Sequence, residues 1–128
     1  MPSQTRRPSQ IPESRLGTGK EILTGSMSET QLVKACLEQL HARKLFAFRM
    51  NTGAFKTELG HFVRFGAKGA PDIILVRQGR FIGIECKVGK GKQSPGQKEF
   101  QDNLEDAGGL YWLVYSIDEL INSLTRRT

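Results

Sequence analysis

The segment that most restricts the fold of this chain is residues 69–89, GAPDIILVRQGRFIGIECKVG. Two apolar runs flank Gln78-Gly79, which predicts a tight β-hairpin because glycine accepts a positive φ in a two-residue turn. With that turn, Asp72 lies directly opposite Glu85 on the neighbouring strand. A one-residue bulge in the turn would shift the register and separate the two acids.

The second apolar run has one apolar and one charged face, because side chains alternate along a strand. The apolar face holds Ile82, Ile84, Cys86 and Val88, and the other face holds Phe81, Gly83, Glu85 and Lys87. Two directly opposed carboxylates repel each other by roughly 3 kcal/mol at an effective dielectric constant of about 20. Protonation of one acid, pairing of Lys87 with both, or a bound divalent cation would remove this repulsion. A surface ladder of salt bridges is the interpretation that needs no ligand.

The composition is that of an ordinary globular protein. A length of 128 residues is enough for one domain with a single core, and 38% hydrophobic with 25% charged residues is typical of such domains. No apolar run has the length of a membrane span, and no apolar stretch of a signal peptide is visible. Cys36 and Cys86 fall on apolar faces, so we expect reduced core residues rather than a disulfide or a zinc site. These features predict a cytoplasmic protein.

The charge balance favours an acidic partner. The net charge is +6 and the pI is near 9.6, so nucleic acid is the first candidate and no membrane partner is expected. Lys68, Lys90 and Lys92 lie close in sequence to the two acids of the hairpin. Residues 1–25 are rich in Pro, Ser, Gly and Arg, which predicts a flexible basic tail before a single domain at residues 26–128.

The remaining segments predict helices and strands around the hairpin. Before the hairpin they are a helix from Ser28, a strand at 45–51, a loop at 52–60 and a short strand or hairpin arm at 61–66. After the hairpin come a helix from Ser94-Pro95 to Gly108-Gly109, a strand at 110–115 and a helix after Ser116. In the helix from Ser94-Pro95, the residues expected to face the core are Phe100, Leu104 and Ala107. The fully apolar run 110–115 predicts a central strand covered on both faces. A helix between the hairpin and this strand implies a mixed sheet with flanking helices, an α/β fold.

Two polar residues sit on the apolar stripes of these helices. Glu29 extends the stripe of the first helix by one turn, and Gln97 lies one turn before Phe100 in the second. Each also has a purely structural interpretation. An acid in the first turn suits the helix dipole, and Gln97 is the partner that a capping box with Ser94 requires.

Asp72 followed by Glu85-Cys86-Lys87 matches the PD-(D/E)XK nuclease pattern, with Pro71 supplying the proline. The surrounding segments FRMNTG, GAPDIIL, GIECKVGKGKQSPGQKEF and GGLYWLVYS resemble the VRR-NUC family (virus-type replication-repair nuclease domain) over about residues 28–117. No motif position departs from the family's pattern. The resemblance implies a restriction-endonuclease-like αβββαβ core and a nuclease activity.

The resemblance also implies roles for individual residues. Asp72, Glu85 and the backbone carbonyl of Cys86 would bind Mg²⁺ or Mn²⁺, and Lys87 would hold the attacking water or stabilise charge on the phosphate. Glu29 would contact a metal through water, and Gln97 would position Lys87 or the scissile strand. Four basic residues would contact DNA phosphates: Arg49, Lys68, Lys90 and Lys92.

The sequence thus favours a metal-dependent, structure-selective DNA endonuclease of a bacterial or phage-infected cell. Small stand-alone members of the family resemble Holliday junction resolvases, which implies branched DNA as substrate and a homodimer. A flap, single-strand or restriction-like nuclease is the alternative within enzymes. A catalytically silent DNA-binding module, with the acids in a salt-bridge ladder, is the alternative outside them.

Overall fold

The computed structural model describes residues 27–51 and 53–126. In chain order the elements are α1 (Glu29–Ala42), β1 (Phe46–Arg49), β2 (Gly53–Lys56), β3 (Phe62–Phe65), β4 (Ile73–Arg77), β5 (Arg80–Cys86), α2 (Pro95–Asp106), β6 (Leu110–Val114) and α3 (Ile117–Thr125). The basic segment 1–25 that the sequence predicts to be flexible lies outside the described residues. No helix within the described ranges is long and apolar enough to cross a membrane.

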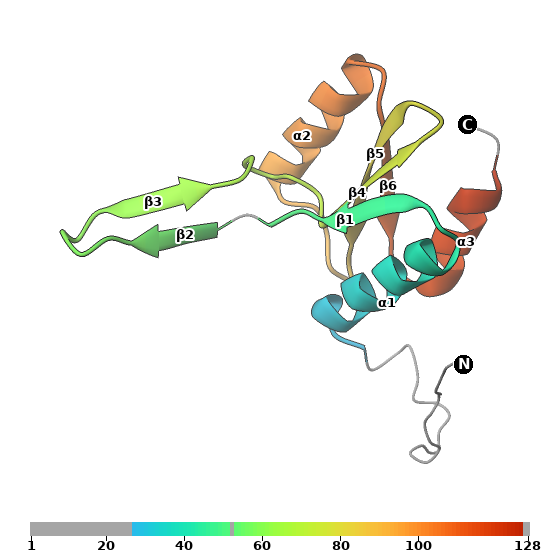
Figure 1. Cartoon of the computed structure of the whole chain (residues 1–128), viewed down its shortest axis with the longest axis horizontal. Helices are drawn as coiled ribbons and strands as arrows, with labels where there is room; N and C mark the ends of the chain where they lie inside the picture. The colour runs from blue at the N-terminus through green and yellow to red at the C-terminus, as the bar shows by residue number, and fades with distance from the viewer. Residues whose placement is uncertain (1–26, 52, 127–128) are drawn as a thin grey trace, which may run out of the picture.

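Four strands form a mixed sheet in the order β1-β4-β5-β6 (Figure 1). β4 runs antiparallel to both β1 and β5, and β6 runs parallel to β5 after the α2 crossover. The predicted mixed sheet with flanking helices is therefore confirmed. β2 and β3 form a separate antiparallel pair that projects from the body of the molecule.

The core lies between one face of the sheet and the helices α1 and α3. It contains the alternating apolar residues of β5 together with the α1 stripe and two leucines of α3: Ile82, Ile84, Cys86, Leu32, Val33, Cys36, Leu40, Leu120 and Leu124. The first residues of α1 are fixed by a reciprocal capping box between Ser28 and Gln31, and the helix begins directly after Ser28 as predicted. Cys36 and Cys86 are free thiols in this core, as predicted, with sulfur atoms 4.0 Å apart.

The hairpin has the predicted turn and register. Gln78 and Gly79 both have positive φ, at 52° and 76°, which gives the strands a tight connection. The ladder pairs Arg77 with Arg80 and continues without a bulge to Ile73 opposite Ile84. The local sequence was sufficient here because the turn chemistry and the apolar alternation favour the same register.

α2 packs on the other face of the sheet, against β6, and glycines allow two close approaches on this side of the molecule. A Cβ added to Gly83 would lie 2.7 Å from Cγ of Pro71, and one added to Gly69 would lie 2.2 Å from the carbonyl oxygen of Gly96. Glycine at these two positions lets Pro71 and the loop before β4 lie directly against β5 and the start of α2. This packing holds the beginning of β4 beside the first turn of α2.

Three expectations about these elements are wrong. The run 110–115 is not a central strand, because β6 lies at the edge of the sheet; it is apolar because α2 and α3 both pack on it. Ala107 does not face the core but is the exposed C-cap of α2. The segment 52–60 is not all loop, since Gly53–Lys56 pairs with β3.

Candidate active site

Asp72 and Glu85 meet at one end of the sheet, where β4 begins and β5 ends. The last pair of the ladder is Ile73 with Ile84, so the next residues along the two strands are Asp72 and Glu85. The backbone N–H of Cys86 donates a hydrogen bond of 2.8 Å to Oδ2 of Asp72. The two carboxylates are thus held on neighbouring strands as the sequence predicts.

Glu85 is the most constrained polar residue of this site. It is 2% exposed, and its Oε2 accepts a 2.9 Å hydrogen bond from Nε2 of Gln97. The ammonium of Lys87 lies 3.5 Å from the same oxygen. The other oxygen, Oε1, is buried and has no hydrogen-bond partner among the described residues. A buried carboxylate oxygen without a partner is costly, so this atom is available for a ligand.

Burial, and after it the nearby charge of Asp72, raise the pKa of Glu85 to about 7 against the opposing effect of Lys87. The pKa of Asp72 is also raised, first by burial and then by Glu29. The Cys86 N–H, Lys87 and Arg49 act in the opposite direction on Asp72. Both pKa values stay above their ordinary values although the Lys87 ammonium is nearby, so one ammonium does not fully neutralise the two acids. This agrees with the repulsion between the two carboxylates that the sequence predicts.

Gln97 makes two sets of hydrogen bonds, one within the cap of α2 and one to Glu85, rather than to Lys87. Its Oε1 accepts a 2.9 Å hydrogen bond from the N–H of Ser94, and the Ser94 hydroxyl accepts the N–H of Gln97, completing the capping box of α2. Its Nε2 remains free for Glu85. The helix cap therefore fixes the amide that donates to the Glu85 carboxylate, so the capping role does not exclude a role of Gln97 at the two acids.

Glu29 lies at the same end of the sheet but is not buried. It is the first residue of α1 and is exposed, so the expectation that it extends the buried stripe is wrong. Its charge nevertheless raises the pKa of both Asp72 and Glu85. A Cβ placed on Gly91 would lie 3.6 Å from Oε2 of Glu29 and 3.6 Å from Cδ of Lys87. Glu29 and Lys87 thus both lie close to Gly91.

Tyr115 is a residue of this region that the sequence analysis did not identify. Its hydroxyl donates a 2.8 Å hydrogen bond to the carbonyl oxygen of Gly91, which ties the basic loop to the segment after β6. Lys90 and Lys92 are exposed on either side of that glycine. The sequence shows Tyr115 only as the end of an apolar run, so no local signal indicates this contact.

The donor set fits a hard divalent cation rather than a soft one. Within residues 27–51 and 53–126, no three side chains of His, Cys, Asp and Glu converge as a metal-binding group. The candidate ligands are two carboxylates and the Cys86 carbonyl. The Cys86 side chain lies in the core beside Cys36, and this contact together with burial raises the pKa of its thiol. Oxygen donors with an unpartnered carboxylate oxygen suit Mg²⁺ or Mn²⁺.

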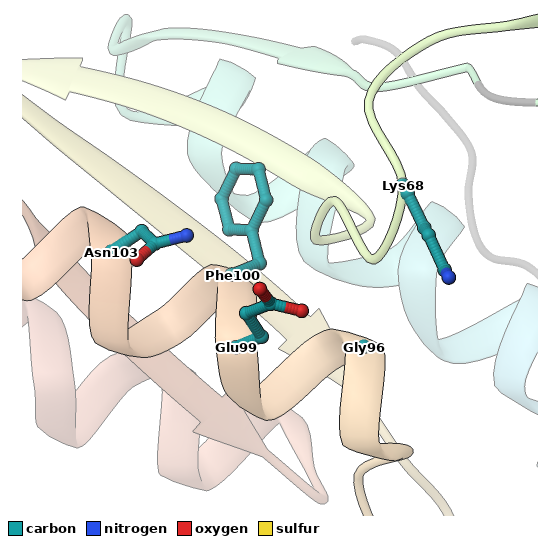
Figure 2. Close-up of a pocket in the computed structure, with 5 residues that line it drawn as sticks. All are labelled: Lys68, Gly96, Glu99, Phe100 and Asn103. Carbon is teal, nitrogen blue, oxygen red and sulfur yellow. The ribbon is translucent and has the colours of Figure 1, made fainter.

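Of the other predicted basic residues, Arg49 lies near the acids and Lys68 lies at a separate pocket. Arg49 is exposed at the end of β1 and lowers the pKa of Asp72. Lys68 comes from the loop before β4 and faces α2 across a pocket of about 270 Å³ (Figure 2). The rest of the pocket is formed by α2: Gly96, Glu99, Phe100 and Asn103. Glu99 and Asn103 are four residues apart, and this spacing is the only signal in the sequence that they lie on the same face of α2.

No protein-family model and no curated protein matches this chain.

Proposed function

We propose that this protein is a metal-dependent, structure-selective DNA endonuclease with branched DNA as its substrate. The observation that carries the proposal is Oε1 of Glu85, which is buried beside Asp72 and has no hydrogen-bond partner within residues 27–51 and 53–126, while the Lys87 ammonium lies 3.5 Å from the other carboxylate oxygen. A bound Mg²⁺ or Mn²⁺ gives that oxygen a partner and offsets the repulsion between the acids. A salt-bridge ladder leaves Oε1 without a partner, which counts against the silent DNA-binding module.

We also propose that this domain belongs to the VRR-NUC family of PD-(D/E)XK nucleases, which its sequence resembles. Without the inserted pair β2–β3, the elements follow the order α1-β1-β4-β5-α2-β6. This is the αβββαβ order of the restriction-endonuclease-like core that the resemblance implies. The motif residues lie at the ends of β4 and β5, and Gln97 reaches Glu85 from the following helix.

The ion would be held by Asp72, Glu85 and the Cys86 carbonyl, and Glu29, whose charge acts on both acids, would contact it through water. When bound, a divalent ion polarises a phosphate and lowers the pKa of a coordinated water. Lys87 places a positive charge where negative charge grows during phosphodiester hydrolysis. Gln97 is a positioning residue, because it acts through the Glu85 carboxylate.

DNA would reach this site across an exposed basic surface. Arg49, Lys90 and Lys92 are exposed at the end of the sheet that carries the acids, and Lys68 is exposed beside the start of α2. Such residues contact phosphates and set the register of the DNA without reading bases. Selection by DNA shape, and hence branched DNA, agrees with a surface of this kind.

We further propose that the active form is a homodimer. The sheet face on which α2 packs is incompletely covered, and the register aligns Phe46, Val76 and Phe81 across three strands. Phe46 is 67% exposed, Phe81 38% and Phe48 43%, and Phe46 and Phe48 pack edge to face. A second copy of the chain on this apolar face would remove it from water. Sedimentation equilibrium tests this: a monomer at tens of micromolar contradicts it.

Cleavage assays test the proposed function. The protein is incubated with end-labelled four-way junction, flap and linear duplex in Mg²⁺, Mn²⁺ or EDTA. We expect metal-dependent cuts in the junction, no cuts in EDTA, and no cuts by Asp72→Asn, whose DNA binding is retained. Cutting of flaps or single strands in preference to junctions would support the other nucleases. Binding of DNA without cutting in every metal would instead support the catalytically silent DNA-binding module.

A further inference from the structure

The β2–β3 arm, residues 53–66, lies outside the core and yet carries large apolar side chains. Figure 1 shows it projecting from the end of β1, away from the helices. At and near its tip Leu59 is 86% exposed, Phe62 75% and Val63 39%. A two-stranded hairpin is at best marginally stable in water by itself. Exposed apolar groups on such an element indicate a surface that binds a partner.

The arm is joined directly to the candidate active site. Its first strand continues from β1, whose last residue, Arg49, pairs with Ile73. The N–H of Met50 donates a 2.8 Å hydrogen bond to the carbonyl oxygen of Asp72, so the root of the arm lies against the catalytic strand. A DNA molecule with its scissile phosphate at Asp72 and Glu85 would therefore extend along or across this arm.

The exposed residues of the arm combine cationic and aromatic groups. Lys56 is exposed and directly opposite Phe62 in the β2–β3 ladder, so the two lie on one face. Arg49 at the root and Lys68 just beyond β3 are also exposed, and Glu58 is the exposed acid near the tip. Cations beside aromatic rings suit a nucleic acid, because cations pair with its phosphates and aromatic rings stack on its bases.

We propose that the arm inserts its apolar tip, Leu59 with Phe62, at the branch point of the DNA while Lys56 contacts the adjoining phosphate. This inference rests on the proposed function and names the feature of the substrate that the protein recognises. Leu59 and Phe62 gain nothing from a phosphate backbone, so they require base surfaces. Apolar wedges enter duplexes by unstacking a base step, and that cost is lowest where bases are already unpaired.

The length of the arm limits the distance between branch and cut. From Gly53 to Leu59 the chain spans at most about 20 Å, its length at roughly 3.3 Å per residue if it were fully extended, and the turn after β2 shortens it. This upper limit corresponds to about six base pairs at 3.4 Å each. Cuts are therefore expected within about six nucleotides of the branch.

Fluorescence of 2-aminopurine tests the insertion without requiring cleavage. The probe base is placed at the branch of a four-way junction, and binding is measured with Ca²⁺ and with EDTA. The full chain should raise the fluorescence of the branch probe and leave a probe within a linear duplex unchanged. Leu59→Ser with Phe62→Ser should abolish the rise and lower the preference for junction over duplex about tenfold, since a stacked base contributes about 1–3 kcal/mol.

Matched variants separate the wedge from a loss of folding. Leu59→Met and Phe62→Tyr keep an apolar or stacking surface and should retain the fluorescence rise. The emission of the single tryptophan, Trp112, which is 6% exposed in β6, should be the same in all of these proteins. If the protein carrying both Leu59→Ser and Phe62→Ser kept the full preference for junction over duplex, the proposal would be overturned. A loss of self-association in this protein with an unchanged branch signal would also overturn it, because the arm would then bind a second copy.

The outcome is independent of whether the protein is a nuclease. If no metal supports cleavage but the branch probe responds and the serine variants lose the response, the nuclease proposal fails and the insertion stands. If cleavage occurs and the branch probe does not respond, the insertion is wrong and the nuclease proposal stands.

Discussion

Replacement of Glu85 by glutamine is expected to stabilise the metal-free protein at alkaline pH. The side chain is 2% exposed and its pKa is raised to about 7 from an ordinary value of 4.5. A carboxyl group whose pKa differs by this much between the folded and the unfolded chain lowers the free energy of unfolding by about 3 kcal/mol once it is ionised in the folded state. Glu85→Gln removes the charge and keeps an acceptor for Gln97, at a cost of about 1 kcal/mol for one buried amide donor without a partner. The net gain is about 2 kcal/mol at pH 8.

The sign of the effect depends on pH. Because the pKa is raised in the folded protein, the stability associated with Glu85 is present at low pH and is lost as the pH rises through about 7. At pH 5 the wild-type carboxyl group is protonated in the folded chain, so wild type and variant should differ by less than about 0.5 kcal/mol. Addition of Mn²⁺ at pH 8 should stabilise the wild type and leave Glu85→Gln unchanged, since a ligand stabilises only the state that binds it.

Urea denaturation followed by the emission of Trp112 measures these differences. Samples in EDTA at pH 5 and pH 8 are compared with samples in Mn²⁺. Glu105→Gln is the matched control, because Glu105 is exposed on α2 and its replacement should change stability by less than about 0.5 kcal/mol. If Glu85→Gln lowered the stability equally at both pH values, Glu85 would be a satisfied structural residue and the argument for a ligand at its Oε1 would be wrong.

Three further predictions concern catalysis, DNA binding and packing. Lys87→Ala should abolish cleavage while a filter-binding assay shows most of the DNA affinity retained; full cleavage by this variant would remove its proposed role. Replacing Lys90 and Lys92 by alanine should reduce the slope of log affinity against log salt by about 2, measured by anisotropy, and an unchanged slope would place the loop off the DNA path. Gly83→Ala should cost about 1–3 kcal/mol in urea denaturation, because its Cβ would lie 2.7 Å from Pro71, and a neutral effect would mean that the proline moves freely.

The hairpin and the pair of acids could be predicted because their determinants are local. Gln78-Gly79 set the turn, the apolar alternation set the register, and together they placed Asp72 against Glu85. The capping box of α2 was also local, and it fixed the position of Gln97. These features depend on residues within one hairpin or one helical turn, where few alternative arrangements exist.

The features that sequence reasoning missed depend on contacts between distant segments. The apolar run of β6 indicates that both of its faces are covered but not how many strands flank it, so its position at the edge was not predictable. β2 was missed because glycine and alanine are weak strand formers. The periodicity that placed Glu29 on the apolar stripe could not reveal that α1 begins beyond the edge of the core, where this residue is exposed.

Titration calorimetry with Mn²⁺ and Mg²⁺ tests the central claim most directly. At pH 7 we predict one site in the wild type, no site in Asp72→Asn or Glu85→Gln, and release of about half a proton per ion, because Glu85 is half protonated near its pKa of about 7. Proton release should disappear by pH 9. Absence of binding to the wild type, or equal binding by wild type and both variants, would contradict the assignment of this end of the sheet as a metal-dependent nuclease site.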